Sequence, residues 1–222
     1  MTQFSASRHG NLPETIPIFP LSGAVLLPGG TLPLYIFEPR YRHMIADARE
    51  GDNLIGMIQP LTDQPDPLPE GAEIFDVGCV GEIARCVERE DGGYEILLNG
   101  LSRFDVHAEI AGVNGYRRIT ADYSRFRGDL SESEATIDNR GDLIAVLKAY
   151  LDANGIDAEM EDVARMPDQA LVNALCAACP LELREKQALL EAADLPARAD
   201  LLNSLLVMAA SPFVDPDTQR EN

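Results

Sequence analysis

Cysteine and histidine are the residue types in this sequence best suited to nucleophilic chemistry or metal binding, and only four cysteines and three histidines occur. Cys176 and Cys179 form a C-x-x-C pair, which is the spacing of redox-active dithiols. The pair falls at the end of a predicted helix, where the helix dipole disfavours a thiolate. We therefore favour buried free thiols over a redox dithiol, and a redox dithiol over a zinc site.

The spacing of the other potential ligands gives a metal site little support. Cys79 and Cys86 are seven residues apart on a predicted strand, and regular pleating turns them to opposite faces. No second histidine stands at zinc-motif spacing from His9, His43 or His107. The sequence therefore predicts no metal and no cofactor.

The motifs of hydrolases and nucleotide-binding proteins are also missing from the sequence. It has no G-x-S-x-G elbow, and the glycine-rich segment Gly23–Gly30 lacks the lysine and the hydroxyl of a phosphate-binding loop. The two lysines, Lys148 and Lys186, lie in predicted amphipathic helices. These patterns give nucleophilic catalysis little support.

Acidic residues outnumber basic ones by 37 to 18, which gives a formal net charge of −19. The excess is spread over both halves of the chain, and no basic run offsets it, so binding to nucleic acid or an anionic membrane is disfavoured. No apolar run reaches the length of a membrane span, and the first residues lack the apolar region of a secretory signal. With few cysteines, these features predict a cytoplasmic protein that binds neither nucleic acid nor membrane.

The first half of the sequence has the pattern of a sheet. Short apolar or alternating runs are separated by glycine-containing turn signals, typical of a barrel-like or sandwich arrangement. Asp91–Gly93 predicts a hairpin turn, and Asn99–Gly100 predicts the turn after it. The predicted strands cover residues 15–19, 31–37, 54–58, 74–90, 94–98, 102–110 and 116–123.

The second half has the spacing of helices. Leu143, Leu147 and Tyr150 repeat at helical intervals until Asn154–Gly155, which predicts a helix end. Asp168 is suited to cap a later helix, and Pro180 interrupts it. The predicted helices cover residues 143–154, 156–166, 168–179, 183–193 and 194–210.

The segment LPLYIFEPRYRHM, residues 32–44, predicts a strand that passes directly into a helix. Pro39 suits the first helical turn, where its missing N–H costs nothing. Glu38 would sit at the helix entry and accept hydrogen bonds from the free backbone amides. We therefore assign a structural role to Phe37, Glu38, Pro39, Arg40 and Tyr41.

A series of segments resembles the amino-terminal substrate-binding domain of the Lon ATP-dependent proteases. The series is IPIFPL (16–21), VLLPGGTLPLYIFEPRYRHMI (25–45), LIGMI (54–58) and NGLSRF (99–104), and EKQALLEAADLPARADLL (185–202) is similar to the helical part of that domain. This resemblance implies an α+β fold, with a PUA-like β-barrel domain followed by a small α-helical bundle. We predict a flexible leader over 1–14, the β-rich domain over 15–126, a linker over 127–141, the bundle over 142–210 and a flexible tail over 211–222.

The resemblance also implies a function. The sequence ends where the ATPase and serine–lysine peptidase modules of a Lon protease would begin, so we expect a non-catalytic module and no enzyme. It would recognise exposed or unfolded polypeptide segments, as an adaptor to proteolysis beside a protease or chaperone. A small-molecule-binding regulatory protein and a thiol redox protein acting through Cys176 and Cys179 are the alternatives.

We expect the polypeptide-binding surface at the proline-rich loop between Gln59 and Gly71 and at residues near the VLLPGG segment. Tyrosine and a proline-rich rim supply contact area at a low cost in conformational entropy. The predicted binding residues are Leu27, Pro28, Gly29, Tyr35, Pro65 and Pro67.

Overall fold

The structure is a computed structural model that describes residues 12–63, 68–69, 71–131, 135–157 and 159–210. Most of the predicted leader and the predicted tail, residues 1–11 and 211–222, lie outside these ranges. Contacts group the chain into two compact units, Met1–Glu134 with Asn173–Glu191, and Ala135–Val172 with Ala192–Asn222. A six-stranded mixed sheet with helices after it confirms the predicted α+β class.

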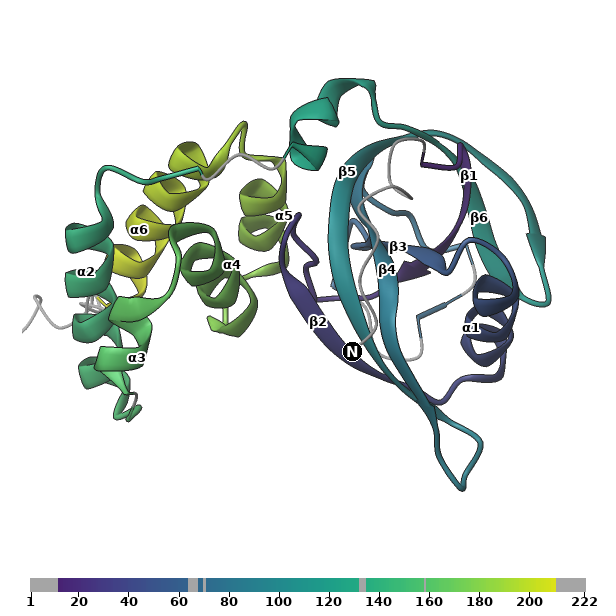
Figure 1. Cartoon of the computed structure of the whole chain (residues 1–222), viewed down its shortest axis with the longest axis horizontal. Helices are drawn as coiled ribbons and strands as arrows, with labels where there is room; N and C mark the ends of the chain where they lie inside the picture. Colours follow the sequence, from purple (N-terminus) through teal and green to yellow (C-terminus); the bar gives the residue numbers. More distant parts are fainter. Residues whose placement is uncertain (1–11, 64–67, 70, 132–134, 158, 211–222) are drawn as a thin grey trace, which may run out of the picture. The chain divides into compact units, whose positions relative to one another are not determined.

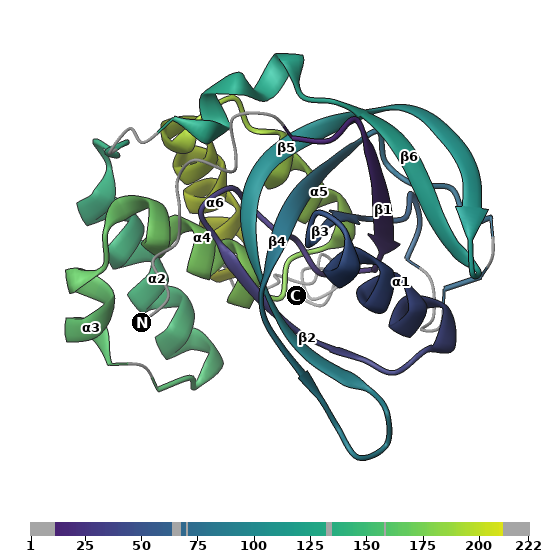
Figure 2. The same cartoon turned by 45° about the vertical axis from the view of Figure 1, so that its right-hand side comes forward.

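The first unit contains a sheet that closes on itself. The strand order is β2-β5-β4-β3-β1-β6, and β5 also pairs with β6. All pairs are antiparallel except β1 with β3. Figures 1 and 2 show the curled sheet, with β1, β6 and the end of β5 adjacent. The strands are β1 Thr15–Pro20, β2 Thr31–Ile36, β3 Leu54–Ile58, β4 Val77–Glu88, β5 Tyr94–Val113 and β6 Tyr116–Asp122.

The predicted turn at Asn99–Gly100 is wrong, because β5 runs unbroken from Tyr94 to Val113. Its first half pairs with β2 and its second half with β6, so one long strand serves both sides of the closure. A Cβ on Gly100 would lie 2.1 Å from the Leu27 carbonyl oxygen, so this glycine allows a close backbone approach within the strand. The turn between β5 and β6 is formed instead by Asn114–Gly115, both with positive φ.

The core of the sheet is built around Phe104 on β5, which is fully buried. Gly78 on β4 makes room for it, since a Cβ there would lie 2.4 Å from the Phe104 ring. Such close packing tolerates little change in volume. The buried cluster consists of Ile16, Ile18, Leu54, Ile58, Val80, Phe104, Ile119 and Ala121.

The strand-to-helix motif forms as predicted, apart from the role of one carboxylate. Helix α1, Pro39–Glu50, has Pro39 in its first turn and Glu38 as its N-cap residue, and buries Tyr41, Met44, Ile45 and Ala48. The Glu38 side chain makes no capping hydrogen bond. It accepts from Arg40 Nε at 2.9 Å, because the Arg40 guanidinium offers a charged donor within reach.

Arg103 on β5 forms a buried ion pair with Asp129, which lies in the short 3₁₀ segment η1, Ser124–Leu130. Arg103 Nε and Nη2 donate to the two Asp129 oxygens at 2.9 and 2.8 Å, and Nη1 donates to the Leu190 carbonyl at 3.2 Å. Leu190 belongs to helix α5, Leu183–Glu191. One guanidinium therefore joins a strand, the 3₁₀ segment and a helix.

Further polar contacts explain why α5 groups with the sheet. Gln187 Nε2 donates to the Val77 carbonyl at 3.1 Å and accepts through Oε1 from Gln59 Nε2 at 3.1 Å. Lys186 Nζ donates to the Gly23 carbonyl at 2.6 Å. The predicted division into a sheet domain and a helical bundle over residues 142–210 stays a prediction. Asn173–Glu191 belongs to the predicted bundle, but its contacts place it in the first unit.

The second unit is helical. Helix α2, Arg140–Asn154, packs on α6, Leu195–Ala210, and a short α3, Met160–Arg165, lies between them in sequence (Figure 1). Gly155, with φ 65°, ends α2 as predicted. Helix α4, Asp168–Ala178, begins in this unit. None of the helices within the described ranges combines the length and apolarity needed to cross a membrane.

The predicted capping role of Asp168 is wrong, because its carboxylate is taken by residues outside α4. It accepts from the Ile137 amide at 2.9 Å and pairs with Arg140. Arg140 also donates to the Met166 carbonyl at 2.7 Å. The carboxylate thereby ties the start of α2 to the start of α4.

We predict that Arg103→Ala lowers the free energy of unfolding of the 222-residue chain by about 3–5 kcal/mol, because it leaves the Asp129 side chain, which is only 10% exposed, without its charge partner. The matched control is Arg125→Ala. Both guanidiniums lie over the Phe126 ring, that of Arg103 at 4.6 Å and that of Arg125 at 4.5 Å, but the Arg125 side chain is 55% exposed. The control should lose about 1 kcal/mol or less. Urea unfolding followed by circular dichroism measures both, and equal losses would contradict the assigned role.

We predict that Asp168→Asn weakens the acid dependence of stability. The Ile137 amide, and after it the Arg140 guanidinium, lower the pKa of Asp168. A lowered carboxyl pKa stabilises the folded state above the unfolded pKa of about 3.9, and this contribution disappears as the pH falls through the folded-state value. Asp168→Asn should lower the melting temperature at pH 7 and flatten its decline below about pH 4.

Asp162→Asn is the control for this experiment, because Asp162 is a largely exposed carboxylate 3.4 Å from Arg165. Its melting temperature should follow the wild type at every pH. Identical pH profiles for Asp168→Asn and the wild type would show that the Asp168 carboxylate does not stabilise the second unit.

Candidate functional site

The predicted binding residues near the VLLPGG segment form part of the framework of the first unit. Leu27 and Pro28 are buried, and the Pro28 carbonyl accepts from Asn173 Nδ2 at 3.0 Å. Gly29 is exposed, has φ 70° and donates to the Gly100 carbonyl at 2.9 Å. Because the Leu27 and Pro28 side chains do not reach the surface, this segment offers a ligand mainly the backbone of Gly29.

In the described part of the predicted proline loop, and just after it, backbone carbonyls accept hydrogen bonds from two arginines. Arg40 Nη2 donates to the Leu68 carbonyl at 2.6 Å, and the Leu68 side chain is buried. Arg117 Nη1 donates to the Ala72 carbonyl at 2.7 Å, just after the loop. Pro65 and Pro67 lie outside the described residues, so their part in binding stays a prediction.

Among the predicted binding residues that the structure describes, Tyr35 is one that presents a side chain at the surface, with 45% of its area exposed. Its ring stacks on that of Phe37, with centroids 6.3 Å apart, and Phe37 is 52% exposed. The Tyr35 hydroxyl donates to Asp91 in the β4–β5 turn. This hydrogen bond raises the pKa of Tyr35 and lowers that of Asp91. Both shifts favour the forms that the contact requires, a protonated Tyr35 hydroxyl and an ionised Asp91 carboxylate.

A groove of about 400 Å³ adjoins this aromatic pair on the outer face of the sheet. Register explains its composition, because Pro33 pairs with Leu97 and Tyr35 with Glu95, and Leu97 is opposite Arg85 on β4. Paired residues share a face of the sheet. We call this site the outer groove, and it is lined by Pro33, Leu34, Tyr35, Arg85, Glu95, Ile96 and Leu97.

Of the residues that line the outer groove, Tyr35 alone is predicted from the sequence as a binding residue. The alternation of TLPLYI places Pro33 on the same face as Tyr35, so Pro33 could have been found from the sequence. The partners on β4 and β5 could not, because their selection depends on strand register.

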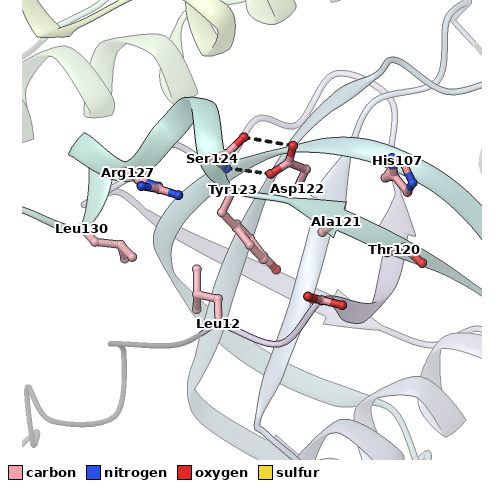
Figure 3. Close-up of a pocket in the computed structure, with 10 residues that line it drawn as sticks. Leu12, His107, Thr120, Ala121, Asp122, Tyr123, Ser124, Arg127 and Leu130 are labelled. Carbon is pink, nitrogen blue, oxygen red and sulfur yellow. Dashed lines mark hydrogen bonds between the residues drawn. The ribbon is translucent and has the colours of Figure 1, made fainter.

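A second pocket, of about 700 Å³, lies where β6 passes into η1 (Figure 3). Its lining mixes apolar side chains such as Leu12 and Leu130 with Glu14, His107 and Arg127. Tyr123 crosses it, and its hydroxyl donates to the Pro13 carbonyl at 3.0 Å. This composition suits a small polar molecule better than an apolar chain.

His107, Asp122 and Ser124 in this pocket are the residue types of a hydrolytic triad, but their arrangement differs from one. The Ser124 hydroxyl donates to Asp122 at 3.0 Å and its amide donates to the same carboxylate at 2.8 Å (Figure 3). In a triad the histidine stands between the serine and the carboxylate. The contact here is a local turn that begins η1, and it lowers the pKa of Asp122.

The thiols of the C-x-x-C pair are both buried in the first unit, as is Cys79, whereas Cys86 is partly exposed. Burial raises the pKa of Cys179, so its reactive thiolate form is disfavoured. None of the four cysteines, all of which the structure describes, forms a disulfide bond. Within the ranges that the structure describes, no three of the Cys, His, Asp and Glu side chains are grouped to hold a metal ion.

We predict that iodoacetamide at pH 8 modifies Cys86 first in the native protein, and modifies Cys176 and Cys179 only after urea is added. Burial controls this order, because both access and thiolate formation are restricted inside the protein. Peptide mass spectrometry over time measures it. Rapid labelling of Cys179 in the native state would contradict the buried-thiol assignment and favour a redox role.

Comparisons with known proteins agree with this fold. Residues 15–208 match the family described as ATP-dependent protease La (LON) substrate-binding domain. Lon protease 2 of Myxococcus xanthus is 29% identical over 200 residues, with 88% of this chain and 24% of that protein covered. The Lon protease of Parabacteroides distasonis is 31% identical over 191 residues, with coverages of 84% and 23%. The chain thus spans about a quarter of the length of these relatives.

Two solved structures share the fold. The Lon N-terminal domain protein from Xanthomonas campestris matches with a TM-score of 0.58 at 24% identity. The N-terminal domain of the Mycobacterium avium complex Lon protease matches with a TM-score of 0.62 at 19% identity. Each comparison covers 86% of this chain and 97% of the other. With the family match over residues 15–208, the chain belongs to the Lon substrate-binding domain family.

Proposed function

We propose that this chain is a non-catalytic module that binds exposed or unfolded polypeptide segments. The observation that carries the proposal is the pair of exposed rings, Tyr35 and Phe37, beside the outer groove. Surface aromatics next to an apolar groove offer a large contact area with few rotatable bonds. Membership of a family described as a substrate-binding domain supports the same function.

The absence of catalysis is also part of the proposal. The family match covers a substrate-binding domain, and the relatives named above are about four times longer than the chain. We propose that the chain delivers its bound segments to a protease or chaperone, as an adaptor. The four cysteines form no disulfide bond, which supports a reducing compartment such as the cytoplasm.

The pocket in Figure 3 favours a second candidate function, a regulatory protein that binds a small polar molecule. A thermal-shift screen with metabolites distinguishes the two, since a ligand at 100 times its dissociation constant adds about 2.7 kcal/mol of stability. A hit that is lost in Arg127→Ala but kept in Tyr35→Ala would favour this second function.

We predict that the double variant Tyr35→Ala, Phe37→Ala binds a fluorescently labelled, reduced and carboxymethylated protein at least about tenfold more weakly than the wild type. Truncation of central aromatic contacts commonly costs about 2 kcal/mol or more. Fluorescence anisotropy measures the affinity, and far-ultraviolet circular dichroism checks that the variant is folded. The same preparations should release no peptide fragments and hydrolyse no nucleotide.

Leu130→Ala is the matched control, because Leu130 is an exposed apolar residue of the same unit, 40% accessible, that lines the Figure 3 pocket. It should leave affinity for the unfolded protein unchanged. The outer groove would be ruled out as the binding site if Leu130→Ala weakened binding and the aromatic double variant did not.

A further inference from the structure

A β-bulge determines where the Arg85 side chain points. Ile83 pairs with Leu98, but Arg85 pairs with Leu97, so Ala84 is an extra residue in β4. In regular register Arg85 would be opposite Ile96, whose side chain is buried. Because pleating alternates faces, the bulge moves Arg85 from the inner face to the outer face. The bulge therefore places a guanidinium in the outer groove.

The surroundings of Arg85 leave this charge available to a ligand. Among the described residues its guanidinium has no ion-pair or hydrogen-bond partner. Glu95, the carboxylate that also lines the groove, lies 3.4 Å from Arg89. The other lining residues are apolar or aromatic, so a bound chain would exclude water and strengthen a contact with the guanidinium.

The edge of β2 favours binding across the face of the sheet over addition of a strand. The Gly100 amide donates to the Gly30 carbonyl at 2.8 Å, which makes Thr31 and Asn99 a non-hydrogen-bonded pair. Thr31, Pro33 and Tyr35 therefore direct their backbone groups to the outer edge. Pro33 has no N–H to donate, so an added strand would lack a hydrogen bond at the centre of this edge.

We propose that Arg85 makes the outer groove selective for extended apolar segments that carry an acidic side chain, whose carboxylate pairs with the Arg85 guanidinium. The inference rests on the proposed function and adds the class of segment. Tyr35, Pro33 and Leu97 contact the apolar side chains, while Arg85 binds the Asp or Glu. The ligand is an internal stretch of a polypeptide and not its end, because the groove lies on an open sheet face and the bound polypeptide can continue past it in both directions.

The test uses the whole 222-residue chain and three labelled synthetic peptides, Ac-GSFLELFSG-NH2 and its counterparts with Gln or Lys in place of Glu. Wild-type protein should bind the Glu peptide about tenfold more tightly than the Gln peptide, which is the usual effect of a hydrogen bond to a charged group. Arg85→Ala should bind the Glu and Gln peptides equally. Arg85→Glu should prefer the Lys peptide.

Arg89→Ala is the matched control, since Arg89 lies on the same hairpin but pairs with Glu95. It should keep the preference for the Glu peptide. The inference is overturned if the wild type binds the Glu and Gln peptides equally, or if Arg85→Ala retains the preference. A further control is the Gln peptide with a free C-terminal carboxylate. The inference is also overturned if this peptide binds as tightly as the Glu peptide, because the groove would then recognise a chain terminus.

The outcomes separate this inference from the proposed function. Equal binding of the Glu and Gln peptides, together with aromatic-dependent binding of the unfolded protein, would remove only the role of Arg85. No binding of any peptide or unfolded protein would remove the proposed function and the inference with it.

Discussion

The buried pair of Arg103 and Asp129 is the contact on which the architecture of the first unit depends. Arg103 lies on β5 between the half that pairs with β2 and the half that pairs with β6. Its side chain is 6% exposed and lies 4.6 Å from the Phe126 ring. A buried guanidinium is tolerated only where most of its donors are satisfied. Asp129 and the Leu190 carbonyl satisfy them, and thereby define where η1 and α5 contact the strand.

The closed sheet separates an inner face used for stability from an outer face available to a ligand. Phe104 and the residues around it fill the interior, and glycine at Gly78 is required for that packing. The outer face of the β2–β5–β4 region carries Tyr35, Leu97 and Arg85 at defined register positions. Binding groups on strands are held more rigidly than those on loops, so the outer groove is preorganised.

The net charge of −19 affects how such a groove can recognise a carboxylate. Over long distances the protein repels acidic chains, and salt at physiological strength screens this repulsion beyond about 8 Å. Recognition by Arg85 would therefore act only at contact distance. Selection of one carboxylate among apolar side chains is compatible with the acidic surface, whereas attraction of highly acidic polypeptides is not.

Local sequence patterns were sufficient for the elements whose conformations depend on near neighbours. The limits of the strand Leu54–Ile58 follow from its apolar run. Helix α1 begins at Pro39 because a first-turn residue needs no amide N–H, and α2 ends before Gly155 because glycine readily adopts a positive φ. Features set by distant pairings were not predictable in this way. Of the two Asn–Gly dipeptides in the sheet half of the sequence, Asn99–Gly100 and Asn114–Gly115, only the second forms a turn, because Gly100 is held inside β5 by the backbone of Leu27. The outward position of Arg85 likewise depends on the register between β4 and β5, which no single stretch of sequence specifies.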